Sequence, residues 1–144
     1  MSSPCSMLAN RTAASKITVM KEQIYSPKAP KPAGPYSQAI RANGFVFASG
    51  QIPTDPRSGE IVRSSVEEQT RQVLENLREV LEAAGSSLAK AVKVTVYLSD
   101  IRNFEAMNAV YAQYFGETPP ARSTFEVAAL PKGVDVEMDV IAVE

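Results

Sequence analysis

Residues 119–143, PPARSTFEVAALPKGVDVEMDVIAV, decide how the C-terminal part of this chain folds. From Val134 to Val143 apolar and polar residues alternate, and this period of two predicts a strand. A preceding strand is predicted from about Arg122 to Leu130. Pro131 to Gly133 supply turn geometry between them, so the stretch predicts two strands joined by a short turn.

The predicted final strand has two different faces. One face carries Val134, Val136, Met138, Val140 and Ala142. The other carries Asp135, Glu137, Asp139, Ile141 and Val143. Pro119 and Pro120 lead the chain stiffly into Arg122, because each proline restricts the backbone around it. A guanidinium therefore starts one strand and carboxylates line its partner, either as a solvated surface or as a site.

A shared cleft for Arg122 and Glu137 requires an irregularity in this pair of strands. In a regular hairpin, pairing residue 130 with 134 places 122 opposite 142. Residue 137 then lies opposite 127, on the other face from 122. We expect the two side chains to face a common cleft, through a bulge, a shifted register, or a position of Arg122 beyond the paired residues.

Composition excludes several classes of function. The chain has 144 residues, enough for one domain with a real core. Fifteen basic against sixteen acidic residues, without a basic run, argue against a nucleic-acid partner. There is no histidine and the only cysteine is Cys5, so we expect neither a metal site nor a disulfide framework. No apolar run approaches the ~18 residues that a membrane span needs, and no cofactor is expected.

The first 20 residues contain no acid and are rich in Ser and Ala. This bias suits a remnant of an organelle transit peptide, for mitochondria or plastids, and it suits a disordered or added tail equally well. Met20 could be an alternative start. We expect residues 1–23 to form an N-terminal extension and residues 24–144 a single domain. The expected compartment is the cytoplasm unless the extension is a targeting signal.

The next segment predicts an irregular lead-in and a hairpin. Residues 26–35 contain four prolines, and Tyr36 to Ile40 then alternates like a strand. Asn43-Gly44 signals a tight turn before a second strand, Phe45 to Ala48, which is apolar on both faces. The strand ends at Ser49-Gly50-Gln51, where Gly50 marks either a bulge or a close approach of a ligand to the backbone.

A first helix is predicted after a surface turn and a possible short strand at residues 60–63. Ser65 and Glu68 match a capping box, in which the hydroxyl and the carboxylate each satisfy a free amide. Gly85 ends the helix. The apolar stripe of the helix comprises Val66, Val73, Leu74, Leu77, Val80, Leu81 and Ala84.

A strand and a second helix follow. The strand has an apolar face formed by Val92, Val94, Val96 and Leu98. Asp100 or Asn103 can cap the helix, which runs to about Phe115. Asn108 lies on the apolar stripe of that helix, and a polar amide there needs a partner. The candidates are a nearby backbone group, a ligand, or a strand of another subunit.

This order of elements predicts an α+β fold with one mixed β-sheet. Two helices cover only one face of a sheet of four to six strands. Several strands are apolar on both faces, so the second face should also be buried. We therefore expect an oligomer in which helix-free sheet faces pack around a symmetry axis.

Several short motifs recur in a fixed order along the chain. They are Gly34-Pro35-Tyr36-Ser37-Gln38-Ala39, Ser49-Gly50-Gln51-Ile52-Pro53, Asn108-Ala109-Val110-Tyr111, Pro120-Ala121-Arg122-Ser123 and Leu130-Pro131-Lys132. Together with the acid-rich final strand, this set closely resembles the Rid (YjgF) family of reactive-intermediate deaminases. The resemblance runs from about Ile24 to the C-terminus, whereas the N-terminal extension is not shared.

The resemblance implies a chorismate-mutase-like α+β fold and a homotrimer with sites at subunit interfaces. The implied activity is cofactor-free hydrolysis of 2-iminobutanoate and 2-iminopropanoate to 2-keto acids and ammonia, which protects pyridoxal-phosphate enzymes from damage. In the family, the counterpart of Arg122 grips the substrate carboxylate. Counterparts of Tyr36, Asn108 and Glu137 line the site, and the resemblance extends substrate binding to Ser49, Gly50 and Thr124. Some members carry cysteine in place of Thr124, so no thiol-based role is expected here.

The residue chemistry agrees with this activity. A 2-imino acid offers a planar carboxylate, which suits the bidentate guanidinium of Arg122. Imines hydrolyse readily once water is positioned, and Glu137 is the candidate to activate that water and to protonate departing ammonia. Tyr36 is expected to hydrogen-bond the substrate, and backbone groups around Gly50 to receive the imine nitrogen. Two alternatives rank lower: a small-ligand-binding or regulatory module without turnover, and an endoribonuclease, which the neutral, histidine-free chain favours least.

Overall fold

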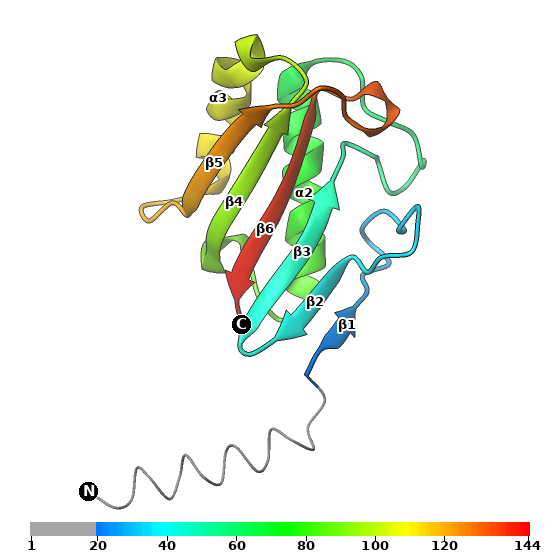
Figure 1. Ribbon diagram of the computed structural model, residues 1–144, viewed down its shortest axis with the longest axis vertical. Coiled ribbons are helices and arrows are strands. Elements are labelled where there is room, and N and C mark those ends of the chain that lie inside the picture. The colour runs from blue at the N-terminus through cyan, green and yellow to red at the C-terminus, as the bar shows by residue number, and fades with distance from the viewer. Residues whose placement is uncertain (1–19) are drawn as a thin grey trace, which may run out of the picture.

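A single mixed sheet with helices on one face forms the body of the protein (Figure 1). The computed structural model describes residues 20–144, and the expected targeting segment with Cys5 lies outside them. The strands are β1 (Glu22–Ile24), β2 (Ala39–Ala42), β3 (Phe45–Gln51), β4 (Ala91–Leu98), β5 (Ala121–Glu126) and β6 (Val136–Val143). The helices of the described part are α2 (Val66–Ala83) and α3 (Phe104–Tyr114), with short 3-10 helices at Leu88–Lys90, Ile101–Asn103 and Pro131–Gly133. The expected α+β architecture is confirmed.

The strand order is β1-β2-β3-β6-β4-β5. Strands β4 and β5 are parallel, and all other neighbours are antiparallel. The predicted hairpin between the last two strands is therefore wrong, because β4 lies between β5 and β6. The reason is the α3 connection: a helix carries the chain from β4 to a parallel neighbour, which no tight turn can do. Strand β5 also ends at Glu126 rather than near Leu130.

The hairpin at Asn43-Gly44 is confirmed. Both turn residues have positive φ, 52° at Asn43 and 80° at Gly44, as a two-residue hairpin turn of this kind requires. Strand β2 starts at Ala39, three residues later than predicted, so Tyr36 lies in the irregular lead-in. Strand β1 was not predicted, and it begins before the boundary that we expected at residue 24.

Helix α2 follows its predicted pattern. The Ser65 hydroxyl accepts a hydrogen bond from the Glu68 amide (3.1 Å), and Gly85 takes a positive φ of 79° just beyond the last turn. The apolar stripe packs on the sheet, with Val73, Leu74, Leu77, Val80 and Leu81 fully buried. The possible strand at residues 60–63 is reduced to one isolated bridge between Thr54 and Ile61.

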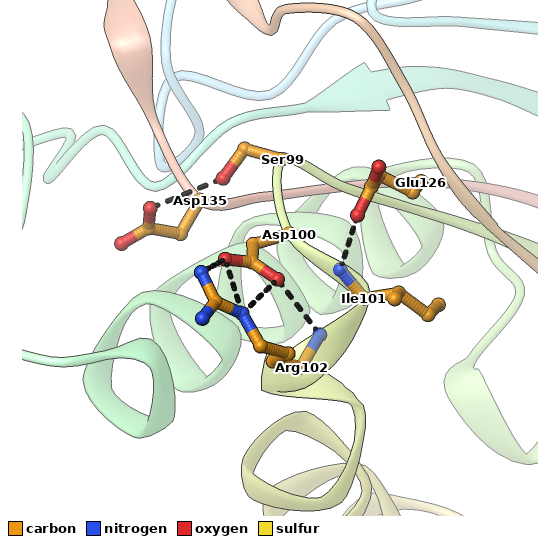
Figure 2. A network of polar contacts seen from close by, with 6 residues as sticks. All are labelled: Ser99, Asp100, Ile101, Arg102, Glu126 and Asp135. Atoms are coloured by element: carbon orange, nitrogen blue, oxygen red, sulfur yellow. Dashed lines mark hydrogen bonds and ion pairs between the residues drawn. The ribbon is translucent and has the colours of Figure 1, made fainter.

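The junction from β4 into α3 is held by polar contacts at the ends of β4 and β5 (Figure 2). The Asp100 carboxylate accepts from the Arg102 amide (2.9 Å), so it caps the 3-10 helix before α3, whereas Asn103 makes no side-chain cap. The Glu126 carboxylate of β5 accepts from the Ile101 amide (2.8 Å). These bonds fix the start of α3 relative to β5. At the other end of β4, a register irregularity between Ala91 and Lys93 turns Val92 out to solvent, contrary to its predicted place on the apolar face.

The core lies between the sheet and the helices, and the opposite face is open in the single chain. On that helix-free face Phe45, Phe47 and Phe125 remain 39%, 44% and 53% exposed. Their strand neighbours are the outward residues of β6 and β4, among them Ile141 and Tyr97. Within residues 20–144, no helix has the length and apolar character needed to cross a membrane.

Candidate functional site

Four of the predicted site residues line one cavity. Its volume is about 530 Å³, and its lining includes Tyr36, Ser49, Gly50, Ile52, Lys132 and Glu137. These residues come from the lead-in, the end of β3, the loop before β6, and β6 itself. We call Tyr36, Ser49, Gly50 and Glu137 the Glu137 half-site.

The Glu137 carboxylate lies against the backbone of β3 at Gly50. Ala48 pairs with Val140 and Gln51 with Met138, so the two residues between them on β3 face one residue on β6. This is a β-bulge. A Cβ atom added at Gly50 would lie 2.1 Å from Glu137 Oε2, which no side chain tolerates without displacing the carboxylate. The bulge predicted at Gly50 is confirmed. The group that approaches its backbone in the single chain is the Glu137 carboxylate, and the approach of a ligand stays a prediction.

The Glu137 carboxylate is suited to exchange a proton. Burial raises its pKa, and the Asp139 carboxylate two residues along the strand raises it further. Asp139 in turn accepts a hydrogen bond from the Tyr97 hydroxyl (2.8 Å). A carboxylic acid with a raised pKa can serve as base and then as acid in one reaction.

The lead-in that carries Tyr36 is tied to β2 by a buried side chain that sequence reasoning missed. The side-chain oxygen of Gln38 accepts a hydrogen bond from the backbone N–H of Ser26 (2.6 Å). The side-chain nitrogen of Gln38 donates to the backbone carbonyls of Ser26 (3.1 Å) and Pro30 (2.9 Å). Ser49 adds a further tie by donating to the Ser37 carbonyl (2.6 Å). A glutamine directly beside a proline-rich loop was the available signal, because such loops have few backbone partners of their own.

The other predicted residues gather between β5 and α3. Arg122 Nη1 donates to Asn108 Oδ1 (2.7 Å), so the partner of the Asn108 amide is the predicted carboxylate-binding group itself. The guanidinium carbon of Arg122 lies 4.6 Å from the ring centroid of Tyr111 and 5.4 Å from that of Phe104. Both distances are within cation–π range. We call Arg122, Asn108 and Thr124 the Arg122 half-site.

Two buried hydroxyls beside Arg122 have no hydrogen-bond partner within the described part of the chain. They are Tyr111 Oη and Thr124 Oγ1. Burial raises the pKa of Tyr111, and the positive charge of Arg122 opposes that shift. Thr124 pairs with the buried Val96, so its side chain points to the helix side together with Arg122. No group of three or more His, Cys, Asp or Glu among residues 20–144 is arranged to hold a metal ion.

The two half-sites lie on opposite faces of the sheet within one chain. Arg122 pairs with Val94, whose side chain is buried under the helices. Glu137 pairs with Tyr97, on the helix-free face. Paired residues project to the same side of a sheet, so Arg122 and Glu137 project to different sides. The common cleft that we expected is therefore absent from the single chain.

The sequence profile of the family described as Endoribonuclease L-PSP matches residues 26–144. The chain belongs to this family, the Rid (YjgF) family. Among Rid-family relatives, a RutC family protein of Pyrococcus horikoshii is 58% identical, covering 85% of this chain and 98% of its own length. A 2-iminobutanoate/2-iminopropanoate deaminase of Capra hircus is 46% identical, covering 88% and 93%. The crystal structure of E. coli TdcF with bound serine superposes with a TM-score of 0.82 at 40% identity, covering 85% of this Rid-family chain and 98% of that one.

Proposed function

We propose that this protein hydrolyses 2-imino acids such as 2-iminobutanoate and 2-iminopropanoate to 2-keto acids and ammonia, without a cofactor. The observation that carries the proposal is the Glu137 half-site. It holds a half-buried carboxylate of raised pKa against the bare backbone of Gly50, in a cavity that Tyr36 also lines. The relative named for this activity supports the proposal.

The chemistry needs one group that both accepts and returns a proton. Glu137 takes a proton from water as the water oxygen bonds to the imine carbon of the protonated imine, which gives a neutral carbinolamine. Glu137 then returns that proton to the amino nitrogen. The C–N bond breaks as the hydroxyl group releases its proton to the departing ammonia and becomes the carbonyl, so the products are a 2-keto acid and an ammonium ion. Positioning and proton transfer of this kind suffice for a substrate as reactive as an imine.

The Arg122 half-site would hold the substrate carboxylate. Asn108 occupies one guanidinium nitrogen and two aromatic rings flank the group, so its orientation is fixed. A fixed guanidinium can grip a carboxylate through parallel hydrogen bonds. Because Arg122 and Glu137 face different sides of one sheet, a complete site needs Arg122 from one chain and Glu137 from a second.

A homotrimer with sites between subunits provides that arrangement. Two features support it: the exposed phenylalanines on the helix-free face, and the position of Arg122 on the edge strand β5. Exposed apolar side chains gathered on one sheet face are typical of an interface. The substrate is thus proposed to lie between two chains of a closed ring.

The test is turnover of 2-iminopropanoate generated freshly by an amino-acid oxidase. We expect ammonia release by the wild-type protein to exceed the spontaneous rate, and Glu137→Gln to lower kcat by about 10²–10⁴-fold, the usual contribution of a general acid–base group. Binding of the 2-keto acid without any acceleration would favour the non-catalytic binding module instead. Cleavage of RNA by the wild type but not by Glu137→Gln would favour the endoribonuclease.

A further inference from the structure

A second cavity opens directly beside the Glu137 half-site. It has a volume of about 340 Å³ and lies between the proline-rich lead-in, the end of β3 and the loop after it. The two cavities share Ala33, Tyr36, Gly50, Ile52 and Lys132, so they adjoin. At about 30 Å³ per water molecule, the second cavity holds the volume of roughly ten waters, far more than the methyl or ethyl side chain of the smallest 2-imino acids.

The wall of this cavity carries the side-chain amide of Gln51, which is open to the cavity. Gln51 is only 7% exposed, and its side chain makes no hydrogen bond with any other residue in the described range 20–144. It pairs with the buried Met138, so it points inward from the end of β3. Because no other side chain or backbone group of the described range engages it, the Gln51 amide is free to donate a hydrogen bond to an occupant of the cavity. Gln38, by contrast, is already bonded to the lead-in.

The charged residues that line the cavity are both cations, Lys31 and Lys132, and no acidic residue lines it. Lys132 adopts a left-handed backbone (φ 58°, ψ 18°), which non-glycine residues seldom take. Its neighbour Gly133 also has a positive φ, of 68°. The chain thus keeps a lysine where glycine would be less strained, in a loop that lines both cavities.

We propose that this cavity receives the side chain of the substrate and is built for a side chain that ends in a carboxylate. The Gln51 amide would donate to that carboxylate, and the ammonium groups of Lys31 and Lys132 would balance its charge. The protein would therefore act on dicarboxylic 2-imino acids as well as on short apolar ones. This inference rests on the proposed function, because it places the reacting carbon beside Glu137.

The experiment is calorimetric titration of the full-length protein with three 2-keto acids, the products of the proposed reaction. 2-Oxobutanoate probes the Glu137 half-site alone. 2-Oxoglutarate and 2-oxohexanoate both reach the second cavity, one with a carboxylate and one with an apolar chain. We expect 2-oxoglutarate to bind about tenfold more tightly than 2-oxohexanoate, the effect of one charge-assisted hydrogen bond.

Two variants and a matched control assign the preference to the cavity. Gln51→Met and Lys31→Gln should each weaken 2-oxoglutarate binding several-fold and leave 2-oxobutanoate binding unchanged. Lys28→Gln is the control, because Lys28 belongs to the same lead-in but does not line this cavity. Lys31 is exposed, so its replacement leaves the fold intact even if Gln51→Met does not.

The outcomes separate this inference from the proposed function. Turnover of 2-iminopropanoate with no preference for 2-oxoglutarate over 2-oxohexanoate would overturn the side-chain assignment alone. An equal loss of preference in Lys28→Gln and Lys31→Gln would also overturn it, because net charge and not the cavity would then be responsible. Absence of both turnover and 2-keto acid binding in the wild type would overturn both proposals.

Discussion

The guanidinium of Arg122 is held by contacts that depend on its planar shape. It donates to Asn108 and lies over the rings of Tyr111 and Phe104. A lysine keeps the charge but has neither the planar fork nor the stacking surface. At this position, shape is therefore expected to matter as much as charge.

We expect Arg122→Lys to lose most imine hydrolysis while the fold survives. One charge-assisted hydrogen bond is worth roughly 1.5–3 kcal/mol, or about tenfold to a hundredfold in kcat/KM. Mispositioning of the carboxylate relative to the water adds to that loss. The measurements are turnover of freshly made 2-iminopropanoate, thermal unfolding and oligomer size. Arg57→Lys, at a 94% exposed side chain, is the control, and near-normal turnover in a folded Arg122→Lys protein would remove the carboxylate-binding role.

The raised pKa of Glu137 predicts that the stability of the protein depends on pH. Its pKa is higher in the folded protein than in the unfolded chain, so its ionised form opposes folding. That opposition is absent below the unfolded-state pKa of about 4.3 and is complete above the folded-state pKa. We therefore expect Glu137→Gln to raise Tm relative to the wild type near pH 8, with a difference that shrinks toward pH ~4. Glu117→Gln, in an exposed loop, controls for the loss of one charge; a difference that grows on acidification would contradict the assignment.

At the residue scale, sequence patterns identified groups that need partners but not the partners themselves. Asn108 stood out because an amide on an apolar helical stripe must be satisfied, yet nothing in the spacing pointed to Arg122. Gln51 did not stand out, because its burial follows from the bulge at Ser49-Gly50 and from loops far away in sequence. The sequence shows which side chains need a hydrogen-bond partner, but which residue becomes the partner depends on how the strands and helices are arranged.

At the element scale, period and turn chemistry predicted the main strands, both helices and the hairpin at Asn43-Gly44. The order of the strands was beyond the same reasoning. Neighbouring strands in sequence usually pair, so β5 and β6 were expected to form a hairpin, but α3 carries β5 to the far side of β4. Strand β1 has only three residues and no visible period, and its pairing with β2 defines it.

The lead-in before β2 offers a test of how the chain positions Tyr36, a residue of the proposed site. We expect Gln38→Leu to lower the free energy of unfolding by about 1–3 kcal/mol, because it leaves the Ser26 amide and nearby carbonyls unsatisfied. It should also reduce turnover, since the same loop carries Tyr36. Denaturant unfolding measures the loss of stability, hydrogen exchange of residues 26–36 reports on the loop, and turnover of freshly made 2-iminopropanoate reports on the site. Gln23→Leu, on the exposed side of β1, is the matched control. Unchanged exchange in Gln38→Leu would show that the loop is held by other contacts.

At the scale of the whole molecule, two features of the single chain support the proposed trimer. Its helix-free sheet face exposes large apolar side chains, and its two half-sites project to opposite sides of the sheet. The proposed trimer would account for both features. It would do so if the contact that covers the helix-free face also places strand β5 of one chain beside the Glu137 half-site of the next. Strands that are apolar on both faces predicted the exposed sheet face from the sequence alone. The placement of Arg122 and Glu137 on opposite faces could be recognised only from the strand order.

Mixing two inactive variants tests whether the site is shared between chains. In the proposed trimer each site takes Arg122 from one subunit and Glu137 from its neighbour. Arg122→Ala and Glu137→Ala trimers should each be inactive. In randomly mixed trimers a site is intact when the first subunit keeps Arg122 and the second keeps Glu137, which happens for about one quarter of the sites.

Co-refolding equal amounts of the two variants should therefore restore about a quarter of wild-type turnover per site. Distinct affinity tags on the two variants verify that mixed assemblies have formed, and light scattering gives their size. Co-refolded Arg122→Ala with Arg122→Lys is the matched control, because no combination of those chains supplies an intact Arg122. If Arg122 and Glu137 acted within one chain, every subunit of the mixture would lack one of them. Mixed trimers without any recovery would therefore contradict a site shared between chains. We expect recovery, because Arg122 and Glu137 project to opposite faces of the sheet.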